Sequence, residues 1–213
     1  MTAPDRLRSI VARDLKPARP LRSPVVRALA IGPLAMATVV AVPLLSLFRS
    51  DMAQLGLLRS WGLSFVEALG GVAVVGLALR ESIPGRALGR GALAAAFVLG
   101  LALPFAIMAA TTTSFSIGPQ VFDLADSVVC FRTSVAAAIP TMLVATLLVA
   151  RALPVRPGVA GALYGLGCGL VADAGLRLYC EFTVPSHFLT AHAGAVVAAL
   201  GAGALAGSFI QRT

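Results

Sequence analysis

Six long apolar runs constrain this 213-residue chain more than any other feature of its sequence. Each holds roughly 17 to 25 residues, the length that a helix needs to cross the hydrocarbon core of a bilayer. The runs cover residues 28–48, 61–79, 92–112, 133–150, 159–178 and 193–210. Charged residues make up only 12% of the chain, against roughly 25% in an ordinary soluble domain. The sequence therefore predicts an all-α membrane protein with six transmembrane helices.

The basic residues predict how these helices are oriented, because Lys and Arg favour the cytoplasmic side of a membrane. Thirteen of them fall in the N-terminal segment, the second-to-third and fourth-to-fifth connections and the C-terminus, and three or four fall on the opposite side. Both termini are therefore expected in the cytoplasm. This distribution also explains the net charge of +8, so direct nucleic-acid binding is not expected.

The chain divides into a cytoplasmic tail over residues 1–27 and a six-helix transmembrane domain over residues 28–213. In the tail, Leu7, Ile10 and Val11 have the i, i+3, i+4 spacing that places apolar side chains on one face of a helix. A helix of about two turns is not stable alone in water, so this face requires a partner, either a protein or the anionic membrane surface.

An extended arm follows this short helix. Its sequence is Asp14-Leu15-Lys16-Pro17-Ala18-Arg19-Pro20-Leu21, and its two prolines exclude a regular helix. The residues expected to bind a partner are Leu7, Ile10, Val11, Asp14, Leu15, Pro17, Arg19, Pro20 and Leu21.

Glycines recur every four residues in the last two runs. They are Gly161, Gly165 and Gly169 in the fifth run, and Gly203 and Gly207 in the sixth. Small residues at this interval let helix backbones approach closely within a bilayer. We expect these two spans to pack against each other; a seam between two copies of the chain is the alternative, which leaves the oligomeric state open.

Glu67, Asp173 and Arg177 are charged residues within or at the edge of the apolar runs. Such residues are costly in hydrocarbon and usually face the interior of the bundle in pairs. Asp173 and Arg177 lie four residues apart, so an intramembrane ion pair between them is expected, and Glu67 should lie at similar depth. A proton or ion pathway is the functional alternative, but the inner half of the runs lacks the ionisable groups that it requires.

Two of the three cysteines, Cys130 and Cys180, fall at the outer ends of the fourth and fifth runs, whereas Cys168 is expected to be a packing residue. In a bacterium the outer pair would meet an oxidising compartment, where it could form a disulfide or offer thiols to an oxidant or soft metal. His187 and His192 follow in the same outer segment. Their spacing from Cys180 matches no zinc signature, so the metal ligands stay undefined.

The sequence contains no nucleophile elbow, no phosphate-binding glycine loop, no paired histidines on a helix and no Cys-x-x-Cys. We therefore expect neither an enzyme nor a bound cofactor.

Several of these features together resemble the negative regulator of sigma F family of six-span anti-sigma factors. They are the arm from Asp14 to Leu21, the loop Glu81-Ser82-Ile83-Pro84-Gly85, Cys130 and Cys180. The resemblance implies a bacterial inner-membrane protein whose tail holds an extracytoplasmic-function sigma factor. It also implies that the two outer cysteines help to release this factor under metal or oxidative stress. Similar proteins often have His-Cys-Pro where this chain has Tyr179-Cys180-Glu181.

Two other classes of protein compete with this reading. A small multispan transporter or channel would need a polar path through the bundle, and a thiol-disulfide membrane enzyme would need a redox Cys-x-x-Cys. The sequence favours a membrane-bound anti-sigma factor, which acts by binding another protein, over both of these classes. Membrane lipids are the other partners expected for such a chain.

Overall fold

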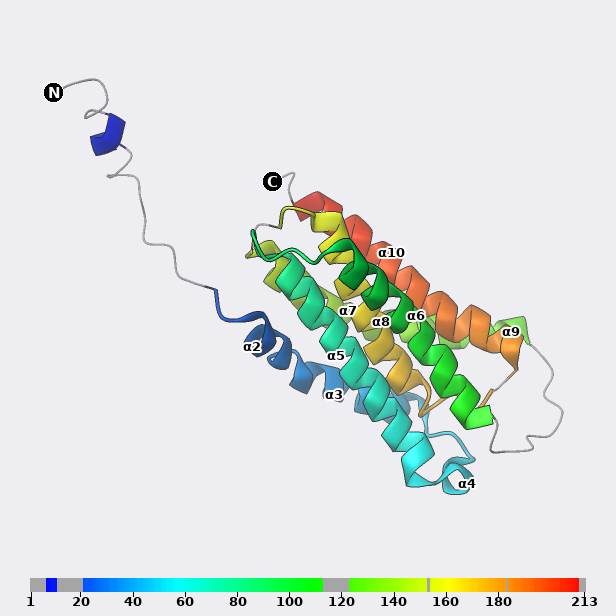
Figure 1. Ribbon diagram of the computed structural model, residues 1–213. Coiled ribbons are helices and arrows are strands. Elements are labelled where there is room, and N and C mark those ends of the chain that lie inside the picture. Colours follow the sequence, from blue (N-terminus) through cyan, green and yellow to red (C-terminus); the bar gives the residue numbers. More distant parts are fainter. Residues whose placement is uncertain (1–6, 11–20, 113–122, 153, 183, 211–213) are drawn as a thin grey trace.

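The computed structural model describes residues 7–10, 21–112, 123–152, 154–182 and 184–210, and it shows a bundle of long helices (Figure 1). Among the described residues, six helices are long and apolar enough to cross a membrane. They are Pro24–Ser46, Met52–Glu81, Arg90–Thr112, Leu124–Ala150, Pro157–Leu176 and Pro185–Phe209. The predicted class, an all-α membrane protein with six spans, is confirmed.

Three of the spans are single helices and three are made of two or three consecutive pieces. The single helices are α6 (Arg90–Thr112), α7 (Leu124–Ala150) and α8 (Pro157–Leu176). The first span consists of α2 (Pro24–Leu29) and α3 (Gly32–Ser46). The second consists of α4 (Met52–Leu57), the π-helix η1 (Leu58–Gly62) and α5 (Leu63–Glu81). The sixth consists of α9 (Pro185–His187), the π-helix η2 (Phe188–Ala193) and α10 (Gly194–Phe209).

The second, fourth and sixth spans begin about two turns before the apolar runs that predicted them. The fourth begins at Leu124 rather than at residue 133, because the Asp123 side chain caps it by accepting a hydrogen bond from the Ala125 backbone N–H at 2.7 Å. Polar residues lower the hydropathy of these first turns but do not end a helix. Cys130 consequently lies inside α7, in its second turn, rather than ahead of the span.

Helix α8 is the centre of the bundle, and 89% of its most apolar window is buried. Its glycines bring it into backbone contact with α10, as predicted. A Cβ atom added to Gly161 would lie 2.2 Å from the carbonyl oxygen of Gly203, and one added to Gly165 would lie 2.3 Å from that of Ala199. Because no side chain fits between them, these two helices are as close as backbones allow.

The opposite face of α8 packs equally closely against α5. A Cβ atom added to Gly71 of α5 would lie 2.5 Å from the carbonyl oxygen of Gly167. The sequence did not predict this contact, because Gly71 belongs to no four-residue glycine repeat. Helix α8 is therefore enclosed between α5 and α10 (Figure 1).

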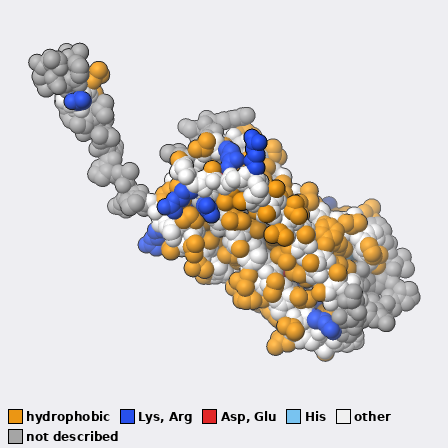
Figure 2. Space-filling view, viewed as in Figure 1, with side chains coloured by type: hydrophobic (Ala, Val, Ile, Leu, Met, Phe, Trp, Pro, Cys, Tyr) orange, Lys and Arg blue, Asp and Glu red, His pale blue; other side chains and the backbone are white. Residues whose placement is uncertain are grey.

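The bundle has two chemically different ends. At the cysteine end, which holds Cys130 and Cys180, Ser50 donates a hydrogen bond to the Glu181 carboxylate at 2.6 Å. At the tail end, where α2 begins, Arg156 forms an ion pair with the buried Glu81 at 2.6 Å. Figure 2 shows apolar side chains over the sides of the bundle and several Lys and Arg side chains at the tail end. The orientation of these ends across the membrane remains the prediction made from the basic residues.

Arg27 ties the first span to the fourth at the tail end. It is buried, and its guanidinium donates a hydrogen bond to the carbonyl oxygen of Leu148 in the last turn of α7. The C-terminus of a helix carries partial negative charge, which favours a cation there. The predicted tail covers residues 1–27, and the first membrane span begins at Pro24, where the Ser23 side chain accepts from the Val26 N–H at 3.3 Å.

Candidate cysteine and histidine site

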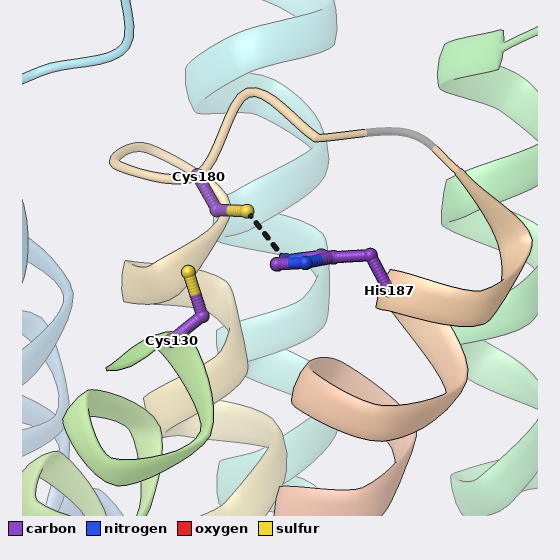
Figure 3. Close-up of side chains that lie close together, drawn as sticks. All are labelled: Cys130, Cys180 and His187. Carbon is purple, nitrogen blue, oxygen red and sulfur yellow. Dashed lines mark hydrogen bonds between the residues drawn. The ribbon is translucent and has the colours of Figure 1, made fainter. Parts of the chain in front are cut away.

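Three side chains from separate elements meet at the cysteine end (Figure 3). Cys130 extends from α7, Cys180 from the segment after α8, and His187 from the last residue of α9. Their sulfur and ring nitrogen atoms all lie within 4.8 Å of one another, and all three residues are buried. The Cys180 sulfur is 3.2 Å from Nε2 of His187. The sequence placed these residues at one end of the molecule but did not identify His187 as the third member.

Ser127 orients the ring of His187. Its hydroxyl donates to the Asp123 carbonyl oxygen at 2.9 Å and lies 3.0 Å from Nδ1 of the imidazole. Because its one proton is used on that carbonyl, the hydroxyl accepts from Nδ1–H. Nε2 then carries a lone pair directed at Cys180. A histidine held in this way is prepared to bind a metal ion through Nε2.

The two thiols are reduced and linked by a hydrogen bond. The hydrogen bond with Cys130 raises the pKa of the Cys180 thiol, burial raises it further, and the neighbouring His192 partly offsets the shift. Cys180 is therefore protonated at neutral pH. A thiolate is the form that attacks electrophiles, so the Cys180 thiol at rest is a weak nucleophile.

The donor set fits a soft divalent ion. Two sulfurs and one imidazole nitrogen occur as zinc ligands in proteins, and sulfur is preferred by soft metals. In a tetrahedral site with metal–sulfur bonds of about 2.3 Å, ligand atoms lie roughly 3.5 to 3.8 Å apart. Atoms already within 4.8 Å of one another need to move only slightly to reach that geometry. The same proximity of the two thiols also suits disulfide formation by an oxidant.

A second cluster of buried polar groups lies between α5, α8 and η2. Asp173 was expected to pair with Arg177. In the structure its partner is instead His192, whose Nδ1 donates to the Asp173 carboxylate at 2.7 Å. Arg177 instead lies 3.6 Å from the Glu67 carboxylate and donates to Thr111 at 2.8 Å. The expected proximity of Glu67 to the other two charges is confirmed. His192 was assigned to the outer segment, because its neighbours are too polar for a hydropathy window.

His192 joins the two clusters. It bonds Asp173 and also shares a hydrogen bond with Cys180. Along α5, no ionisable side chain lies between Glu67 and Arg80, a rise of roughly 20 Å. Glu81, at the end of α5, accepts from the Leu88 N–H at 2.6 Å and so stabilises the loop that follows this helix. Among the described residues, the cluster formed by Glu67, Asp173, Arg177 and His192 is therefore confined to the cysteine end.

The tail is only partly described by the structure. Leu7 and Ile10 belong to a helical turn over residues 7–10 and are 63% and 48% exposed, and Leu21 is also exposed. The other residues predicted to bind a partner lie outside the described residues; they are Val11, Asp14, Leu15, Pro17, Arg19 and Pro20.

Comparison with known proteins gives one family. The model of a family described as negative regulator of sigma F matches residues 11–212, which is nearly the whole chain. Neither the curated proteins nor the solved structures gave a significant match.

Proposed function

This chain belongs to the negative regulator of sigma F family, and on that basis we propose that it holds an extracytoplasmic-function sigma factor at the bacterial inner membrane. The observation that carries the proposal is the family match, which begins at residue 11 and so includes the proline-containing arm. The exposed Leu7 and Ile10 add an apolar surface of the kind that a protein partner covers. With both termini in the cytoplasm, tail and sigma factor share one compartment.

Cys130 and Cys180 would sense the signal from the opposite side of the membrane. Binding of a soft metal to these thiols and His187 displaces the thiol protons and draws the three residues together. An oxidant that accepts two electrons instead converts the two thiols into one disulfide and releases two protons. Both events change how α7 is held against the end of α8. The convergence of the three side chains within 4.8 Å supports this assignment.

A physical route connects this site with the tail. Cys130 lies near one end of α7, and at the other end the Leu148 carbonyl holds Arg27, where the tail joins the first span. A displacement of α7 therefore acts directly on the base of the tail. Release of the partner requires that the signal favours one of two arrangements of the bundle over the other.

Deletion of residues 1–21 tests the binding role of the tail. We expect the shortened protein to insert into the membrane and to leave the sigma factor soluble, because the bundle begins at Ser23 and Pro24. Membrane fractionation of a tagged sigma factor measures this. Retention of the sigma factor at the membrane would assign the binding to the loops instead.

Two point variants distinguish a protein partner from simple attraction to lipid, which is worth about 1 kcal/mol per basic residue. Leu15→Asp and Pro17→Ala leave every basic residue in place, yet each should release the sigma factor. Undiminished binding by both variants would favour the lipid surface.

Metal binding by the purified full-length protein should depend on pH. We expect one Cd²⁺ or Zn²⁺ per chain, with an affinity that rises about tenfold per pH unit for each thiol proton displaced. Because the pKa of Cys180 is raised, the increase should continue above the pH at which a free thiol is ionised. Titration calorimetry from pH 6 to about 10, a range that passes the ordinary thiol pKa of about 8.5, measures this.

Ser127→Ala removes the group that orients His187, so we expect its metal affinity to fall roughly 10- to 100-fold. The matched control is Cys168→Ser, which alters a buried thiol far from the site. A variant lacking both Cys130 and Cys180 that still binds the metal normally would show that the ion sits elsewhere.

A further inference from the structure

An apolar groove of about 900 Å³ opens on the side of the bundle near the tail end. One wall is a single face of α5 that includes Leu69, Ala73 and Leu77, and the other is α2 with Val25 and Leu29. Leu69, Val25 and Leu29 are 52%, 67% and 65% exposed, so the groove faces the lipid rather than the core.

The length of the groove matches one half of a bilayer. Its α5 wall extends from Leu69 to Arg80, a rise of roughly 16 Å, and half of a hydrocarbon core is about 15 Å thick. A single acyl chain lying along α5 would therefore reach from the membrane surface to the middle of the bilayer.

Three arginines surround the end of the groove that lies at the membrane surface. Arg80 and Arg86 line it, and a second cavity of about 440 Å³, lined by Arg22 and Arg86, shares Ser23, Pro24 and Arg86 with it. All three guanidiniums are exposed, and none forms an ion pair with another described residue. No carboxylate lines either cavity among the described residues. This leaves positive charge beside an apolar channel.

We propose that this groove binds an anionic phospholipid, with an acyl chain along α5 and the phosphate between Arg22, Arg80 and Arg86. Basic pockets between transmembrane helices at the membrane surface are the sites where anionic headgroups bind. The groove is open toward the bilayer, so a lipid can enter it sideways. The headgroup then lies beside residues 21–25, where the tail joins the bundle. This site requires only that the tail end lies at a membrane surface and does not rest on the proposed function.

Charge argues against the tail as the occupant of the groove. Residues 1–20 carry five basic residues and two aspartates, so the arginines at the rim would repel them. An anionic headgroup meets the same arginines with the opposite charge.

Native mass spectrometry of the full-length protein with dioleoyl phosphatidylglycerol and dioleoyl phosphatidylethanolamine tests the proposal. We expect the anionic lipid to remain bound in preference to the other. The triple variant R22Q/R80Q/R86Q should bind it on the order of a hundredfold more weakly, and each single variant roughly fivefold. The matched control is Arg90→Gln, which removes a basic residue at the start of α6 outside the groove.

Ala73→Phe fills the groove and leaves all three arginines in place, so it should displace the lipid while the protein stays folded by circular dichroism. Glycerol phosphate, a headgroup without acyl chains, should not compete. Equal binding of the two lipids, or undiminished binding by Ala73→Phe, would overturn the proposal. Tighter lipid binding after deletion of residues 1–20 would also overturn it, because the tail would then be the natural occupant.

Discussion

Replacing Cys130 or Cys180 by serine should abolish the response of sigma-dependent transcription to cadmium and to oxidant, and the double replacement should do no more. A disulfide needs both sulfurs, and an ion held by three ligands loses most of its affinity with either thiolate. Basal repression should stay intact, because neither residue belongs to the tail. A transcriptional reporter, with and without the stressor, measures the effect.

His187→Ala separates the two kinds of signal. It removes the nitrogen 3.2 Å from the Cys180 sulfur but neither thiol, so the metal response should be lost while the oxidant response remains. Cys168→Ser is the control and should respond normally to both. If the two single cysteine variants each lost part of the response and their losses added, the residues would act separately.

Gly203→Val should strongly destabilise the bundle. A Cβ atom at this position would lie 2.4 Å from the Gly161 carbonyl oxygen and 2.8 Å from the Gly165 Cα, so α10 and α8 must separate. The expected loss exceeds the roughly 1–3 kcal/mol of ordinary overpacking, because backbone cannot rotate away as a side chain can. Thermal unfolding in detergent micelles measures the loss.

Gly201→Val is the matched control on the same helix. Apart from its own stretch of α10, no atom lies within 4 Å of a Cβ atom at Gly201, so this variant should fold almost as well as the unaltered protein. Equal stability of the two variants would mean that α10 and α8 are not held together by close backbone contact.

Hydropathy predicted the six spans because a bilayer imposes a length and an apolar composition on each helix. It placed the starts of several spans too late, since the polar turns that precede the apolar runs of α7 and α10 are also helical. Asp123 is a good N-cap residue, and this signal in the sequence could have moved the start of α7 to the observed position.

The site was predicted only in part for a different reason. The sequence assigned Cys130 and Cys180 to one face, but the side-chain partners depend on which helices become neighbours. Helical spacing suggested Asp173 with Arg177, whereas η2 brings His192 to Asp173 from outside α8. No zinc signature was visible because the three candidate ligands come from two segments about 50 residues apart in the chain.

The two cysteines are mechanically unequal, because the helices that carry them are held so differently. Helix α8, which leads to Cys180, is packed between α5 and α10 and has little freedom to move. Helix α7 is less constrained, since only 28% of its most apolar window is buried. If the two sulfurs are drawn together, α7 is therefore the helix that we expect to shift. A tilt of about 5° at Cys130 displaces Leu148, roughly 27 Å away along the helix, by roughly 2 Å. A shift of that size would break the hydrogen bond between the Leu148 carbonyl and Arg27, so under the proposed function α7 would transmit the signal from Cys130 to the base of the tail.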